Sequence, residues 1–218
     1  MEYKKTLQLQ AYEYIKNKIL NNDMLYNEIY SETKIAKELG ISRTPVRDAI
    51  QYLSQERYID IIPNKGFCLH KMEMQDFIDT MEIRTAIEGY CVRQIAKEYE
   101  SQKAKDTFKK LEELIEMQKK SLNISLEDFF EADMLFHITI VNHINNNELK
   151  KLFSSYIYRM RNFAMHSLGH EGRMETTIEE HLEILNNIKK GNAINAYESI
   201  VLHMESPKDI SVNDIYSL

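Results

Sequence analysis

The sequence predicts a mostly α-helical chain in which an N-terminal winged helix-turn-helix precedes an all-α bundle of about six helices. Apolar residues recur at helical spacing along most of the 218 residues. No proline lies between Pro63 and Pro207. Two short segments around one turn are the only predicted strands. We therefore expect two domains, residues 1–71 and 72–206, and a C-terminal tail, residues 207–218.

The first predicted helix spans Gln8 to Leu20. Residues at helical spacing form its expected inward face: Leu9, Tyr12, Ile15, Ile19 and Leu20. A second, short helix has an apolar face made of Ile35, Ala36 and Leu39. Gly40 follows it, where a helix commonly ends in a left-handed residue.

The third predicted helix begins after Ser42, which can cap it. Pro45 fits the first turn, where its missing N–H would have had no intrahelical partner. Its buried stripe is expected to be Val46, Ala49, Ile50 and Leu53, which leaves Arg43, Thr44, Arg47 and Gln51 facing outward. Two short helices joined by a tight turn, the second basic at its exposed start, are typical of a DNA-binding helix-turn-helix. A compact three-helix domain of another function can show the same spacing.

A small hairpin is predicted after these helices. Tyr58 to Ile62 and Phe67 to Leu69 are β-prone, and Pro63 to Gly66 form a turn between them. Such a hairpin is the wing of a winged helix-turn-helix.

Composition and charge indicate a cytoplasmic protein whose acidic residues are concentrated in the second domain. The chain is 43% hydrophobic and 28% charged, and no apolar run of membrane-spanning length is present. Cys68 and Cys91 are far apart in sequence, so reduced thiols are expected. Residues 1–70 carry 10 Lys or Arg against 9 Asp or Glu, and the other 148 residues carry 18 against 25. Because the first domain is nearly neutral, DNA affinity should come from a few placed contacts and from dimerisation.

Six helices are expected in the second domain. Their predicted limits are residues 74–99, 103–120, 125–146, 148–167, 173–190 and 192–205. The breaks between them fall at Ser, Asn and Gly residues, of which Gly191-Asn192 forms the last turn.

Four polar residues interrupt the apolar faces of these helices. Asp133 and His137 lie four residues apart, so both face one side of a helix. His181 lies 10 residues before Gly191 and His203 lies 12 after it. With about 1.5 Å of rise per residue, the two imidazoles reach similar heights on antiparallel helices.

Three imidazoles and a carboxylate suit a divalent transition metal ion with open coordination positions. Zinc is the first candidate, and nickel and manganese are alternatives. Each of the four residues could instead be a hydrogen-bonded core residue, and Asp133 with His137 could be a simple pair.

The segment SRTPVRDAI, residues 42–50, with Leu53 and Glu56 after it, resembles the signature of the GntR family of bacterial transcription regulators. In that family the recognition helix enters the major groove of DNA and the wing reaches the adjoining minor groove. The resemblance implies DNA contacts from seven residues: Ser42, Arg43, Thr44, Pro45, Arg47, Lys65 and Gly66. Two places depart from the family pattern. Tyr26-Asn27 replaces a usual Pro-Gly, and Arg57 replaces the Gly that usually follows Glu56.

The second domain is similar to the FCD-type ligand-binding domain of the same family. Its metal-binding members use an Asp-x-x-x-His on one helix and a His on each of the last two, a pattern filled here by Asp133, His137, His181 and His203. Arg84 and Glu88 match the family's Arg-x-x-Leu-Glu element, with Ile87 in place of Leu. The match implies that Arg84 binds an effector carboxylate, whereas the spacing alone also allows an internal ion pair with Glu88.

The other basic and imidazole side chains have less specific sequence contexts. Arg159 and Arg161 are secondary candidates for the effector contact. The remaining histidines match no motif and are assigned to the surface or to loops: His70, His143, His166 and His170.

The sequence thus predicts a cytoplasmic, homodimeric transcription regulator that acts as a repressor on double-stranded operator DNA. A small organic acid bound at the metal site of the second domain is expected to control it, and no enzymatic activity or membrane association is expected. Two alternatives remain. The site could belong to a metal-dependent hydrolase that activates water, or the helical domain of a DNA-binding regulator could be purely structural.

Overall fold

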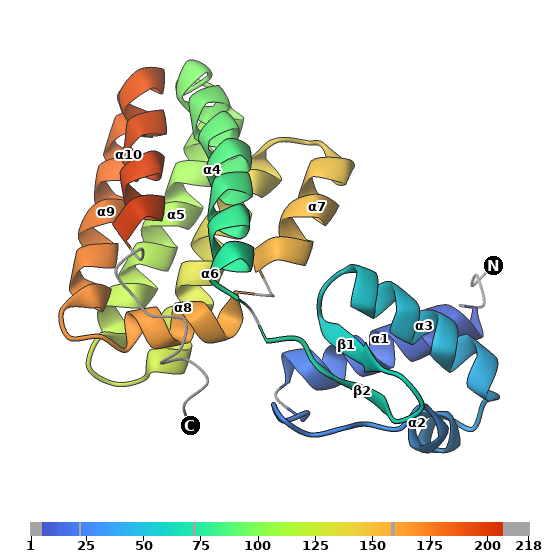
Figure 1. The fold of residues 1–218 in the computed structure, drawn as a ribbon. Coiled ribbons are helices and arrows are strands. Elements are labelled where there is room, and N and C mark those ends of the chain that lie inside the picture. Colours follow the sequence, from blue (N-terminus) through green and yellow to red (C-terminus); the bar gives the residue numbers. More distant parts are fainter. Residues whose placement is uncertain (1–5, 22, 72, 158–159, 207–218) are drawn as a thin grey trace. The chain divides into compact units, whose positions relative to one another are not determined.

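The computed structural model describes residues 6–21, 23–71, 73–157 and 160–206. The predicted C-terminal tail, residues 207–218, lies outside the described residues. The chain divides into two compact units, Met1–Lys71 and Met72–Leu218, and each is considered by itself (Figure 1). None of the helices in the described part of the chain is both long and apolar enough to cross a membrane.

The first unit contains three helices and a two-stranded sheet. The elements are α1 (Leu7–Leu20), α2 (Glu32–Leu39), α3 (Arg43–Gln55), β1 (Ile59–Ile62) and β2 (Gly66–Leu69). The strands pair antiparallel, with Ile59 opposite Leu69 and Ile62 opposite Gly66. This arrangement confirms the predicted winged helix-turn-helix.

Helix α1 packs on α3 through a face that differs in part from the predicted one. Ala11 and Ile15 are its fully buried residues. Leu9 was expected to face inward, but it is 41% exposed. Ala11 and Ile15, four residues apart, lie on the same buried face of α1, and Leu9, two residues before Ala11, lies on the other side of the helix.

Five described backbone positions of this unit, one of them Asn64 in the hairpin turn, have positive φ, which L side chains rarely adopt. Gly40 ends α2 with φ of 65°, as the sequence predicts. Asn27 and Arg57, which replace family glycines, keep the glycine conformation at φ of 69° and 57°. Gly66 has φ of 135°, and a Cβ there would lie 2.1 Å from the Tyr30 carbonyl oxygen.

The second unit is an all-α bundle in which the described residues form seven helices. They are α4 (Met74–Lys97), α5 (Gln102–Ser121), α6 (Leu126–His143), α7 (Asn147–Ile157), α8 (Arg161–Leu168), α9 (Arg173–Lys189) and α10 (Ala193–Glu205). The segment 148–167, predicted as one helix, is two, α7 and α8. No Gly or Pro marks this break. The separate α8 places Phe163 in a stacked contact with Phe77 of α4, with ring centroids 3.9 Å apart.

The core of the bundle lies between α4, α5, α6, α9 and α10. Figure 1 shows α10 beside both α9 and α4, and α5 packs on α6. Fully buried Phe129, Phe136 and Ile140 of α6 face this core. Because α6 is enclosed by its neighbours, polar residues on its inner side must find partners inside the protein.

Candidate functional site

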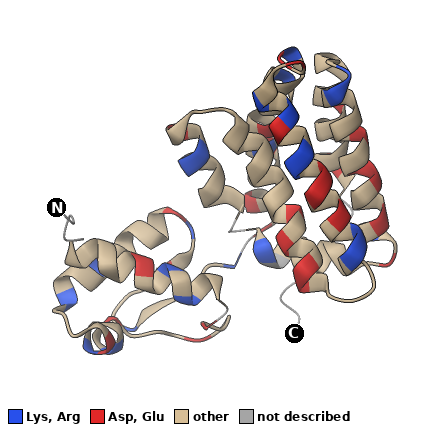
Figure 2. Ribbon diagram, turned by 180° about the vertical axis from the view of Figure 1, so that it is seen from behind, with Lys and Arg blue, Asp and Glu red and all other residues tan. Residues whose placement is uncertain are grey.

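Helix α3 presents a polar and basic start at the surface of the first unit; Figure 2 marks Lys and Arg residues along the ribbon in blue. Ser42, Arg43, Thr44 and Arg47 are exposed and Pro45 is partly buried. Ser42 occupies the N-cap position, although its side chain makes no capping hydrogen bond. Lys65 is exposed in the hairpin turn. Gly66 is explained by its contact with Tyr30, whose backbone exchanges two hydrogen bonds with Phe67.

Glu32, at the start of α2, binds both recognition-helix arginines. Arg47 donates from Nε and Nη2 to the two carboxylate oxygens, at 3.2 and 2.9 Å. Arg43 donates from Nη2 to the same carboxylate. The hydrogen bonds from Arg47 and Arg43 lower the pKa of Glu32 to about 2. Glu32 was not among the residues predicted to matter for DNA binding.

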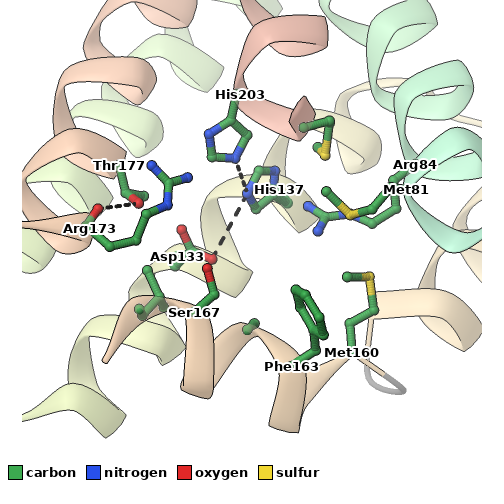
Figure 3. Close-up of a pocket in the computed structure, with 13 residues that line it drawn as sticks. Met81, Arg84, Asp133, His137, Met160, Phe163, Ser167, Arg173, Thr177 and His203 are labelled. Atoms are coloured by element: carbon green, nitrogen blue, oxygen red, sulfur yellow. Dashed lines mark hydrogen bonds and ion pairs between the residues drawn. The ribbon is translucent and has the colours of Figure 1, made fainter. Parts of the chain in front are cut away.

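In the second unit, three helices bring the four predicted metal ligands together, and Figure 3 shows three of them, Asp133, His137 and His203. Asp133 and His137 lie on α6, His181 on α9 and His203 on α10. The three histidines are buried, and each offers a ring nitrogen within 4.8 Å of the others. Nε2 of His137 lies 3.3 Å from Nε2 of His203. Asp133 lies 3.6 Å from Nε2 of His181 and 4.0 Å from that of His137.

The other ring nitrogen of each histidine is held from outside the cluster. Nδ1 of His137 bonds to Glu88 at 2.5 Å, and Nδ1 of His203 bonds to Glu180 at 2.6 Å. Nδ1 of His181 lies 3.0 Å from Oε1 of Gln118. An acceptor at Nδ1 selects the tautomer whose Nε2 carries a free lone pair. The sequence had marked only Glu88 of these three acceptors, and as a partner of Arg84.

Burial sets the electrostatics of the cluster. It lowers the pKa of His181 far below its ordinary value and also lowers that of His203. Burial alone would raise the pKa of Glu88 and Glu180. The nearby Arg84 and His137 outweigh it for Glu88, the hydrogen bonds from His203 and Arg173 outweigh it for Glu180, and both pKa values fall to about 2. At neutral pH Glu88 and Glu180 are therefore ionised and His181 and His203 are neutral, and a neutral imidazole is the form that binds a metal ion.

A cavity of about 50 Å³ opens beside the cluster. Arg84 lines it, and the predicted ion pair is present, since Nε donates to Glu88 at 2.9 Å. Nη2 of Arg84 is buried without a hydrogen-bond partner. Arg161 instead pairs with Glu131 at 3.8 Å, and Arg159 lies outside the described residues. Arg173 of α9 also lines the cavity, and it is not among the residues predicted from the sequence to bind a ligand.

His143 is not a surface or loop residue, and that assignment was wrong. It is 4% exposed on α6. Its Nδ1 lies 2.8 Å from the Thr107 hydroxyl and its Nε2 lies 2.5 Å from Glu98. His143 thus joins α6 to α5 and to the end of α4 as a hydrogen-bonded core residue.

Comparison with known proteins identifies both units. Residues 7–69 match the gntR family of bacterial regulatory proteins, and residues 79–206 match the FCD domain. The HTH-type transcriptional regulator YdhC of Bacillus subtilis is 27% identical over 199 residues, which are 89% of this chain and 86% of YdhC. The gluconate operon transcriptional repressor of the same organism is 26% identical over 178 residues, 81% of this chain and 70% of the repressor.

A solved structure shows the same fold. E. coli McbR/YncC superposes with a TM-score of 0.73 at 19% identity, over 98% of this chain and 100% of that one. The two family matches together cover nearly the whole described chain. The chain therefore belongs to the GntR family of bacterial regulatory proteins, as a DNA-binding transcription regulator whose second unit is an FCD domain.

Proposed function

We propose that the chain is a homodimeric repressor whose affinity for operator DNA is controlled by a small carboxylate bound beside a divalent transition metal ion. The observation that carries the proposal is the convergence of ring nitrogens from three buried histidines next to an arginine-lined cavity. The relatives are named as transcription regulators, which points to a regulator and away from an enzyme. One of them is named as a repressor of the gluconate operon, which supports the repressor assignment.

In this proposal the metal is held by Asp133, His137, His181 and His203. Nε2 of His181 is fully buried without a hydrogen-bond partner, and a metal ion that accepts its lone pair would satisfy it. Two nitrogens that bind one tetrahedral zinc ion at about 2.0–2.1 Å lie roughly 3.3–3.4 Å apart, and Nε2 of His137 and His203 are 3.3 Å apart. The donor set of three nitrogens and one oxygen suits zinc first, then nickel or manganese. With these four protein ligands in place, the ion would take a carboxylate oxygen as a fifth ligand.

The first unit is proposed to bind DNA through α3 and the wing. Arg43, Thr44 and Arg47 are exposed on one face of α3, and Lys65 lies exposed at the wing turn. An arginine that reaches a base edge or a phosphate must leave or share its protein partner, so Glu32 decides how freely these two arginines contact DNA.

Replacing Glu32 by Gln is expected to strengthen binding to random DNA and to reduce discrimination in favour of the operator. The carboxylate repels phosphates and fixes the direction of Arg43 and Arg47, whereas the neutral amide does not repel phosphates and, with one acceptor oxygen, holds the two arginines less firmly. The measurement is a titration of full-length protein with operator and random duplexes at several salt concentrations. Glu38→Gln, on the same helix but bound to Lys18 and Tyr14, is the matched control. An unchanged specificity ratio would show that Glu32 only stabilises the domain.

Dimerisation through the second unit is expected, because one recognition helix and one wing read too few base pairs for useful specificity. Light scattering on the full chain and on residues 72–218, which have their own hydrophobic core, should give twice the chain mass in both cases. A fragment that is monomeric at micromolar concentration would place the dimer contact elsewhere.

The proposal as a whole is tested by selecting bound duplexes from a random pool with metal-loaded protein. The selection is repeated with and without a panel of organic acids. Enrichment of a two-fold symmetric site, lost on addition of an acid and only when metal is present, is the expected result. A site whose occupancy is indifferent to both metal and acids would contradict the control mechanism.

A further inference from the structure

We propose that Arg173 is a second anion-binding residue of the cavity, on the opposite side from Arg84, and that the ligand is a compact monocarboxylate that requires the bound metal. The inference rests on the function proposed above and narrows the class of its effector. It depends on three observations. Each of the two arginines is linked through a glutamate to a histidine of the cluster, each has a buried N–H group without an acceptor, and the buried charges of the site do not cancel.

Two Arg–Glu–His chains of hydrogen bonds converge on the cluster from different helices. In the first, Arg84 donates to Glu88 at 2.9 Å, and Glu88 holds Nδ1 of His137 at 2.5 Å. In the second, Arg173 donates to both oxygens of Glu180 at 3.0 and 2.9 Å, and Glu180 holds Nδ1 of His203 at 2.6 Å. Figure 3 shows Arg84 and Arg173 on opposite sides of Asp133 and His137.

Each arginine has a buried donor without a partner. These atoms are Nη2 of Arg84 and Nε of Arg173. The two side chains are 9% and 12% exposed, and both line the cavity. An unsatisfied guanidinium N–H in a buried site is costly unless an acceptor enters. A carboxylate beside the metal would provide acceptors for both arginines.

The buried charges favour a monoanion. Among the described residues that line the cavity or bond to its arginines and histidines, Asp133, Glu88 and Glu180 carry three negative charges and the two arginines carry two positive charges. A histidine that donates Nδ1–H and coordinates through Nε2 is neutral. A divalent ion therefore changes the site from −1 to +1. A monocarboxylate brings the metal-loaded site to a net charge of zero. In the metal-free site it would make the net charge more negative, from −1 to −2.

The size and walls of the cavity limit the rest of the ligand. About 50 Å³ exceeds the space for a single water molecule several-fold but excludes a long chain in this conformation. Met81, Met160, Phe163 and Met204 provide apolar walls, and the buried Ser167 provides one hydroxyl. These walls suit a carboxylate of about two to four carbon atoms with a short apolar body.

The test is calorimetric titration of full-length protein, zinc-loaded or metal-free, with acetate, propionate and succinate. For wild type we expect the two monocarboxylates to bind the loaded protein more tightly than succinate does, and not to bind the metal-free protein. Arg173→Gln should lower the affinity for propionate at least about tenfold, because a charge-assisted hydrogen bond is lost. Arg173→Lys should recover part of this loss by restoring the charge. Arg161→Gln, whose side chain pairs with Glu131 outside the cavity, should bind as wild type does.

Metal content and thermal melting of each variant without acid separate binding from stability. If Arg173→Gln keeps its zinc and melting temperature but binds propionate as wild type does, the role of Arg173 is overturned. If Arg173→Gln and Arg173→Lys lose zinc equally, Arg173 acts only by supporting Glu180, which also overturns it. Tighter binding of succinate overturns the monoanion assignment while leaving metal-dependent control intact. Failure of the wild-type protein to bind zinc would instead contradict the proposed function itself.

Discussion

Arg47→Ala is expected to abolish specific operator binding and to leave the fold and the oligomeric state unchanged. The Arg47 side chain is 57% exposed, and its partner in the structure is the surface carboxylate of Glu32. A recognition-helix arginine that reads a base or grips a phosphate contributes about tenfold to a hundredfold in affinity. In a dimer the loss occurs in both half-sites, so the combined effect approaches the difference between specific and nonspecific binding.

Fluorescence anisotropy with the selected duplex measures this loss, and circular dichroism checks the fold. Lys110→Ala is the control, because Lys110 is an exposed cation on α5 of the second unit and its loss changes the net charge equally. Operator affinity that stays at the wild-type level in Arg47→Ala would remove Arg47 from the DNA interface.

His181→Ala is expected to reduce bound metal strongly, to lower the melting temperature and to weaken the response to a carboxylate. His181 is completely buried, and its ring stacks on Phe136 with centroids 3.9 Å apart. Truncation removes one metal ligand and leaves a void next to Phe136, which costs at least about 2 kcal/mol by comparison with other large-to-small core substitutions. Operator binding without ligand should persist, because none of the four proposed metal ligands lies in the first unit.

A second buried histidine provides the matched control. His143 lies outside the cluster, and its partners are Thr107 and Glu98. His143→Ala should therefore lower the melting temperature but retain metal and the response to carboxylate. Elemental analysis, thermal melting and DNA titration on the same preparations compare the two variants. Full metal content and a normal response in His181→Ala would mean that the four residues form a buried polar network, as in the structural alternative.

The sequence predicted the structure well where a backbone conformation or a helix face restricts which residue types can occupy single positions. Gly40 ends α2 in a left-handed conformation as predicted, and Pro63 to Lys65, within the predicted turn, separate the two strands. The predicted register of His181 and His203 about Gly191 agrees with the structure, in which their ring centroids lie 4.9 Å apart. Helical periodicity is a property of neighbouring residues, so it can be read without knowing the fold.

Other features carried no such local signal. The break between α7 and α8 lies in a stretch without Gly or Pro, where the contact of Phe163 with Phe77 is a tertiary contact. His143 resembles a surface residue in sequence because its partners are 36 and 45 residues away.

The sequence by itself determined the order and type of the elements, the winged helix-turn-helix, and the helix faces on which Asp133, His137, His181 and His203 lie. Only the tertiary structure decided what surrounds them. Gln118 of α5 bonds to His181, 63 residues away in the sequence, and Arg173 reaches the cavity because α9 packs beside α10 and α4. The reason is physical: a helix face follows from spacing along one segment, whereas the partner of a buried polar group depends on which segments meet in space.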